Sequence, residues 1–176
     1  MFDNTLESQD FPNVHIDDAA AAAACAKYLN EKKVKRVAAV FGPEELNISK
    51  NRKAGFQGNL NTNIICDICY APDAKAAYDF VNEQINTHQT SAFFGISDEV
   101  LLGIVTAIKE NRLSKKTIVI GFSDGLTMPF LHRQLHYIFH DGKIVGEHAA
   151  NLILSHIEES PTHKQNIEIK VELIGA

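Results

Sequence analysis

The chain has 176 residues, of which 45% are hydrophobic and 22% are charged, and its formal net charge is −5. This balance is typical of a soluble globular protein, and the length allows one domain with a substantial core. No basic stripe appears, which excludes an electrostatic surface for nucleic acid on these residues. The first residues predict no signal peptide, and no apolar run is long enough to span a membrane.

Short apolar runs alternate with segments of helical periodicity along the chain. After an extended piece at 14–16, Asp17 or Asp18 can cap an alanine-rich helix that reaches Asn30. Ser49 can cap a second helix, which contains Phe56. The further strands are predicted at 35–41, 63–70, 92–94, 117–120, 136–139 and 167–173, and the further helices at 73–85, 98–110, 126–131 and 143–158. This order predicts a single α/β domain over 1–176, with a doubly wound, mostly parallel sheet flanked by helices.

Two strands of this pattern end at a Ser-Asp pair, Ser97-Asp98 and Ser123-Asp124. In parallel α/β sheets, ligands bind beyond the carboxyl ends of the strands. Both pairs should therefore lie on the same rim of the sheet. The sequence predicts a small-molecule site there, built from polar side chains and without a cofactor.

The cysteines are three in number, Cys25, Cys66 and Cys69. An odd count in a chain of this size indicates a reducing, cytoplasmic compartment rather than a disulfide framework. Cys66 and Cys69 form a C-x-x-C within a predicted strand, where residues three apart point to opposite faces. We therefore expect buried thiols rather than a redox or metal site.

Other motifs for chemistry are weak or missing. His132, His136 and His140 are spaced by four residues, but the predicted strand at 136–139 interrupts a helical register, so we expect no metal site. The loop 42–47 fits neither phosphate-binding glycine pattern, and no G-x-S-x-G elbow occurs. The sequence therefore predicts a protein that is not an enzyme. The sequence allows two interpretations of Arg52: an exposed surface arginine, or a guanidinium that holds hydroxyls or a carboxylate at the rim.

Six segments, taken in order, resemble the effector-binding region of LacI/GalR-type bacterial transcriptional regulators. Arg36–Pro43 resembles that family's R-I-A-x-I-x-G-P strand, and Asn51–Phe56 its x-R-x-x-G-F helix. The other four are Pro12–Asp18 with the alanine-rich helix, Ser97–Gly103 (N-D-x-x-A-x-G), Ile118–Asp124 (V-I-G-F-D-D) and Gly146–Ile153 (G-x-x-A-x-x-x-L). The similarity extends from about Phe2 to the C-terminus, and Phe2-Asp3 resembles the end of an earlier strand.

The resemblance implies a type 1 periplasmic-binding-protein fold, in which two subdomains close on a small molecule, often a sugar or a nucleobase. This chain then corresponds to the C-terminal subdomain of a cytoplasmic homodimer that contacts DNA only through a helix-turn-helix preceding Met1. The helix at 141–158 is expected to pack on the absent N-terminal subdomain. Its apolar face (Ile144, Ala149, Ile153 and Ile157) should otherwise dock on a partner chain or fold back on the sheet.

The resemblance also implies the effector-binding residues. The family's arginine at Arg52 reaches the ligand, and Ser97 and Ser123 stand where the family has an asparagine and an aspartate. The other expected lining residues are Asn47, Ile48 and Tyr70. Serine is short and neutral, which indicates a less acidic pocket and argues against a standard hexose or purine. A sugar-binding protein of a transport system is the main alternative, and an α/β enzyme the third.

Overall fold

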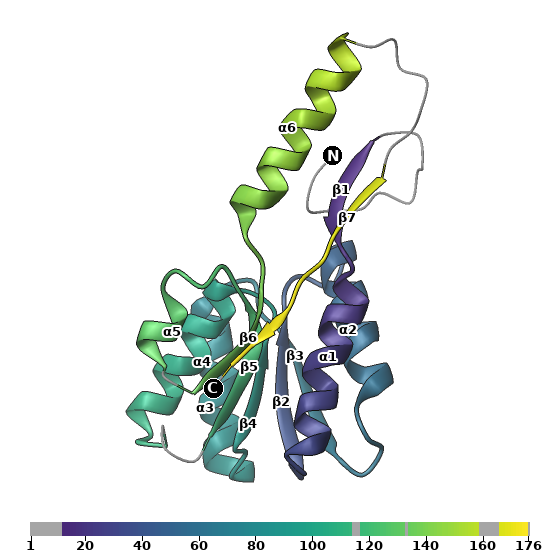
Figure 1. Ribbon diagram of the computed structural model, residues 1–176. Coiled ribbons are helices and arrows are strands. Elements are labelled where there is room, and N and C mark those ends of the chain that lie inside the picture. Colours follow the sequence, from purple (N-terminus) through teal and green to yellow (C-terminus); the bar gives the residue numbers. More distant parts are fainter. Residues whose placement is uncertain (1–11, 114–116, 133, 159–165, 176) are drawn as a thin grey trace.

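The computed structural model describes residues 12–113, 117–132, 134–158 and 166–175 (Figure 1). The expectation about Phe2-Asp3 lies outside these residues. The strands are β1 (Asn13–Ile16), β2 (Arg36–Phe41), β3 (Ile65–Tyr70), β4 (Ala92–Gly95), β5 (Ile118–Ser123), β6 (Leu135–Phe139), β7 (Asn166–Ile169) and β8 (Leu173–Ile174). The helices are α1 (Asp18–Glu31), α2 (Asn47–Asn59), α3 (Ala74–His88), α4 (Asp98–Glu110), α5 (Met128–Leu131) and α6 (Gly142–Glu158).

Six strands form the main sheet, in the order β3-β2-β4-β5-β6-β8. All neighbouring pairs are parallel except β6 and β8, which are antiparallel. Helices α1 and α2 cover one face, and α3 and α4 cover the other (Figure 1). The predicted α/β class, with a mostly parallel, doubly wound sheet, is therefore confirmed.

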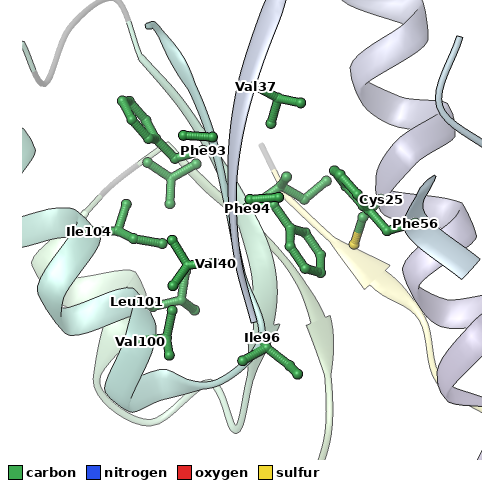
Figure 2. Close-up of a cluster of buried hydrophobic side chains, with 14 of the residues drawn as sticks. Cys25, Val37, Val40, Phe56, Phe93, Phe94, Ile96, Val100, Leu101 and Ile104 are labelled. Atoms are coloured by element: carbon green, nitrogen blue, oxygen red, sulfur yellow. The ribbon is translucent and has the colours of Figure 1, made fainter. Parts of the chain in front are cut away.

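The core lies on both faces of the central strand β4. Phe93 and Phe94 are adjacent and point to opposite sides, and Figure 2 shows Phe94 directed toward Phe56 of α2 while Leu101 of α4 lies on the other face. The rings of Phe94 and Phe56 have centroids 4.2 Å apart. Burial on two faces explains why β2 and β4 read as continuous apolar runs rather than alternating patterns.

The two helices on one face approach each other closely at Gly55. A Cβ atom built on Gly55 would lie 2.0 Å from the backbone oxygen of Ala19 in α1. The side chains of α1 at this interface are also small: they are alanines, of which Ala22 and Ala26 are fully buried. This contact fixes the start of α1 beside α2, where it contributes to the rim described below.

Side-chain caps account for most helix starts. Asp17 accepts a hydrogen bond from the N–H of Ala20 at 2.9 Å, and Asp73 accepts one from Ala76 at 2.8 Å. The expected cap at Ser49 is wrong, because α2 begins two residues earlier and Leu46 precedes it without a side-chain cap. Ser49 is instead the third residue of the helix, and its Oγ is buried without a hydrogen-bond partner among the described residues.

The predicted C-terminal strand at 167–173 is two strands in two sheets. β7 pairs in parallel with β1 in a separate two-stranded sheet, whereas β8 adds to the edge of the main sheet beside β6. The segment 170–172 joins them. A single run of alternating residues carries no signal for this change of partner, because both halves are half-buried strands.

Helix α6 extends away from the main sheet, next to β1 and β7 (Figure 1). Val145 and Leu152 are buried against Val14, with Ala149 packed beside them. The expected apolar face is therefore only partly right: Ala149 belongs to the packed side, whereas Ile153 and Ile157 are exposed. The helix does not fold back on the main sheet, and its exposed apolar side has no partner among the residues described.

Candidate functional site

The two Ser-Asp pairs lie at the carboxyl edge of the main sheet, as predicted, and they are hydrogen-bonded to each other. Ser123 is the last residue of β5, and Ser97 precedes α4 just beyond the end of β4. The Oγ of Ser123 donates to Oδ1 of Asp98 at 2.5 Å, and the N–H of Asp124 donates to Oδ2 at 2.9 Å. The carboxylate of Asp98 therefore joins the ends of β4 and β5.

The two serines have different roles within the protein. Ser97 caps α4, because its Oγ accepts from the N–H of Val100 at 3.4 Å. Ser123 is 2% exposed and, besides donating to Asp98, accepts from the N–H of Gly125 at 3.0 Å. Ser123 therefore directs its hydrogen-bonding capacity mainly toward the protein.

Arg52 reaches the same edge from the second turn of α2. It is only 3% exposed, so the reading as an exposed surface arginine is wrong. Its Nε donates to Oδ1 of Asp18 at 2.7 Å, and its Nη1 donates to the backbone oxygen of Ile96 at 2.6 Å. The guanidinium carbon lies 3.7 Å from the centroid of the Phe122 ring, a stacked cation–π contact.

One of the three guanidinium nitrogens of Arg52 has no acceptor among the described residues. Nη2 of Arg52 is buried and has no hydrogen-bond partner within the described part of the chain. The Asp18 carboxylate offsets the positive charge, and Ile96 and Phe122 hold the plane of the group. The arrangement presents a fixed, planar donor at the point where β4 and β5 end.

The other expected residues, Asn47, Ile48 and Tyr70, lie elsewhere along the same edge of the sheet. Asn47 and Ile48 open α2 and are partly buried. Tyr70 ends β3, which is separated from β4 by β2, and its hydroxyl accepts from Nζ of Lys53 at 2.5 Å. The structure therefore brings Arg52, Ser97 and Ser123 together and places Tyr70 on the outer part of the rim.

Sequence reasoning missed Asp18 and Phe122 as parts of this site. The sequence predicts Asp18 only as a possible cap, but Asp17 caps α1 and Asp18 binds Arg52. The adjacent pair of aspartates was the available signal, since one helix needs only one such cap. The stacking of Phe122 on Arg52 has no counterpart in local sequence, because it joins residues from α2 and β5.

The histidines do not form a cluster on one helix. His132 follows α5, His136 lies in β6 and His140 follows β6. The ring nitrogen Nε2 of His136 is 2.7 Å from the hydroxyl of Tyr28. Burial lowers the pKa of His136, and the positive charge of Lys32 lowers it further. In the described ranges, no group of three His, Cys, Asp or Glu side chains is arranged to hold a metal ion.

Cys66 and Cys69 lie in β3, as the sequence predicted. Burial raises the pKa of the Cys66 thiol to about 11, and it also raises the pKa of Cys69. Both thiols are free. The C-x-x-C therefore has neither the helix start nor the lowered thiol pKa of a redox motif.

Residues 26–175 match the sequence profile of the periplasmic binding protein-like domain. The chain belongs to this family. Among curated relatives, it is 27% identical to the HTH-type transcriptional repressor PurR of Salmonella newport, over 94% of this chain and 51% of that protein. The PurR of Klebsiella pneumoniae is 25% identical, again over 94% of this chain and 51% of that protein. The chain thus spans about half the length of the curated relatives that it matches.

Solved structures of this fold are also similar. A LacI family transcriptional regulator from Enterococcus faecium with bound ribose has a TM-score of 0.83 at 18% identity, covering 98% of this chain and 67% of that one. A periplasmic solute-binding protein of an ABC transporter from Actinobacillus succinogenes with bound D-allose has a TM-score of 0.87 at 19% identity, covering 99% and 68%. The PurR relatives confirm the resemblance to LacI-type effector-binding regions, and the solved structures confirm the periplasmic-binding-protein-like fold. Along the described ranges, no helix is long and apolar enough to cross a membrane.

Proposed function

We propose that this chain is the effector-binding and dimer-forming part of a LacI-type bacterial transcriptional regulator. Its ligand is a small, sugar-like molecule bound at the rim by Arg52, with Ser97, Ser123, Asn47, Ile48 and Tyr70 around it. The chain performs no catalysis. The ligand acts by shifting the equilibrium between two arrangements of the subdomains, because it binds one of them better.

The observation that carries this proposal is the unpaired donor of Arg52. A buried N–H without an acceptor costs about 1–3 kcal/mol, so a ligand oxygen that pairs with it gains binding free energy. Nη2 of Arg52 is such a donor, and the groups around it fix its direction. A ligand oxygen would satisfy it, and this accounts for a guanidinium held rigidly at the edge of the sheet.

The exposed side of α6 supports a second, absent wall for the site. Ile153, Leu154 and Ile157 are all exposed on this helix, and Ile157 is 75% exposed. Together with β1 and β7, α6 forms the start of a second subdomain in this proposal, and the rest of that subdomain covers its apolar side. One wall buries only part of a ligand, so this chain alone binds weakly.

A further apolar surface supports a homodimer. Leu126 and Phe130 are 74% and 84% exposed, and Leu102 of the neighbouring helix α4 is 42% exposed. Apolar patches of this kind mark interaction sites more often than free surface. In the proposed regulator, two copies meet through this surface, and DNA is contacted only by a helix-turn-helix segment outside these 176 residues.

The main alternative is a sugar-binding protein of a transport system, which the likeness to the allose-bound solute-binding protein favours. The two functions use the same rim, so the geometry does not separate them. The coding sequence upstream of Met1 does: an in-frame helix-turn-helix identifies a cytoplasmic regulator, whereas a secretory signal identifies a transport protein.

The test replaces Arg52 with alanine in the full-length regulator. We expect the effector response to be lost while DNA binding in the absence of effector stays unchanged, as measured by operator-binding titration. Arg36→Ala is the matched control, because Arg36 lies at the opposite end of β2 and pairs with Asp67 at 2.6 Å. A normal response from Arg52→Ala would remove this residue from the site.

A further inference from the structure

The polar group that the ends of β4 and β5 offer to a ligand is Asp98 rather than Ser123. Ser123 has one proton, which it donates to Asp98, and it is nearly buried. Asp98 is partly exposed. An ionised carboxylate has about four acceptor positions, and Ser123 and the N–H of Asp124 occupy one on each oxygen of Asp98. Each oxygen therefore keeps capacity to accept from a ligand.

The start of α4 is a favourable position for the negative charge of a carboxylate such as that of Asp98. Asp98 is the first residue of α4, where the N–H groups of the first turn favour a negative charge. The ion pair of Arg52 is made with Asp18, and none of the ion pairs found in the described ranges involves Asp98. The carboxylate is thus held in place by neutral donors and is not neutralised by a cation.

Arg52 and Asp98 are neighbours through two intervening residues. Nη1 of Arg52 binds the backbone oxygen of Ile96, two residues before Asp98. The guanidinium stacks on Phe122, which precedes the serine that binds Asp98. A donor and an acceptor, each held by its neighbours, therefore lie at the ends of the same two strands, β4 and β5, and no ion pair found among the described residues joins them. Adjacent hydroxyl groups of a sugar can both donate and accept, and they fit such a couple.

We propose that Asp98 is a ligand-contacting residue that determines specificity for a polyhydroxylated effector. Its carboxylate accepts from one ligand hydroxyl while Nη2 of Arg52 donates to the oxygen of another. Ser123 is a positioning residue that fixes the rotamer of Asp98, so the carboxylate absent at position 123 is supplied from the start of α4. This inference rests on the proposed function and names the chemical class of its ligand.

The experiment uses the full-length protein and a panel of aldopentoses and aldohexoses that includes D-ribose and D-allose. A specific binder is first defined as a sugar whose affinity is lost in Arg52→Ala. For that sugar, Asp98→Asn should weaken binding at least tenfold, and Ser123→Ala should weaken it severalfold. Glu99→Gln is the matched control, since Glu99 carries the same charge in the same first turn and is exposed. It should leave affinity unchanged.

Deoxy analogues of the same sugar separate contact from support. One analogue, lacking the hydroxyl that donates to Asp98, should bind the wild type as weakly as the parent sugar binds Asp98→Asn. In Asp98→Asn, that analogue and the parent sugar should then bind equally. Two results would overturn the assignment while leaving Arg52 and the proposed function in place. One is an unchanged affinity of Asp98→Asn for the parent sugar. The other is that Asp98→Asn weakens the binding of every analogue by the same factor as that of the parent sugar. The absence of any Arg52-dependent sugar would overturn both proposals.

Discussion

The close approach of α1 and α2 makes a sharp prediction about two glycines of one helix. Gly55→Ala would place a methyl group 2.0 Å from the backbone oxygen of Ala19, a distance that requires the two helices to separate. Gly58→Ala lies three residues later in α2, and its methyl group would meet no atom within 4 Å. The two substitutions have the same chemistry and differ only in what the added carbon contacts.

The magnitudes follow from two opposing effects. Replacing glycine by alanine in a helix interior stabilises by about 0.5–1 kcal/mol. Overpacking destabilises by about 1–3 kcal/mol, and a rigid backbone neighbour places Gly55→Ala at the upper end of that range. We therefore expect Gly55→Ala to lower the free energy of unfolding by about 2 kcal/mol and Gly58→Ala to raise it by up to about 1 kcal/mol. At roughly 2–4 °C per kcal/mol, the melting temperatures move by about 4–8 °C downward and up to about 4 °C upward.

Urea unfolding followed by circular dichroism measures both free energies, and thermal melts check their order. The same shift should reach the rim, because Asp18 begins the helix that Gly55 holds, and its bond to Arg52 is 2.7 Å long. Gly55→Ala should therefore weaken effector binding, whereas Gly58→Ala should not. If Gly55→Ala were as stable as Gly58→Ala, the described spacing of α1 and α2 would be refuted.

Three further predictions concern other parts of the chain. Because burial raises the pKa of Cys66 to about 11 and also raises that of Cys69, both should react with iodoacetamide at pH 7.5 more slowly than glutathione, and rapid alkylation in a mass-spectrometric time course would contradict this. The lowered pKa of His136 means that the folded state binds fewer protons than the unfolded state, so stability present above pH 6.5 should fall as the pH drops through the folded-state pKa. Urea midpoints at pH 7.5 and 5 should show a smaller loss in His136→Gln than in the wild type. Phe130→Ser combined with Leu126→Ser should shift the proposed dimer toward monomer in analytical ultracentrifugation, and an unchanged sedimentation coefficient would exclude this surface.

The sequence predicted the strands and helices of the main sheet because their signals are local. Buried parallel strands are short continuous apolar runs, and Asp73 and Ser97 mark helix starts through their caps. The predicted cap at Ser49 was wrong because serine is a common cap residue, whereas α2 starts without a side-chain cap. The division of the C-terminal segment into β7 and β8 depends on partners more than a hundred residues away in β1 and less than forty away in β6, and no local pattern encodes that choice.

The position of the site residues on the rim was predictable, but their contacts with one another were not. Strand ends at Ser97 and Ser123 located the rim correctly, because the carboxyl ends of parallel strands share one edge. The hydrogen bond from Ser123 to Asp98 depends on side-chain rotamers in two loops. It changes which of these residues can offer a free acceptor, and residue types alone do not show this.

The chain passes between its two sheets three times in the described residues: between β1 and α1, between β6 and α6, and between β7 and β8. Three covalent tethers so close together oppose sliding of one sheet past the other and leave bending about a hinge as the easier motion. Asp18 is the first residue of α1 and directly follows the first of these tethers, and it holds Arg52. A ligand that pulls on the guanidinium would therefore act on the chain directly beside one of the connections between the two sheets.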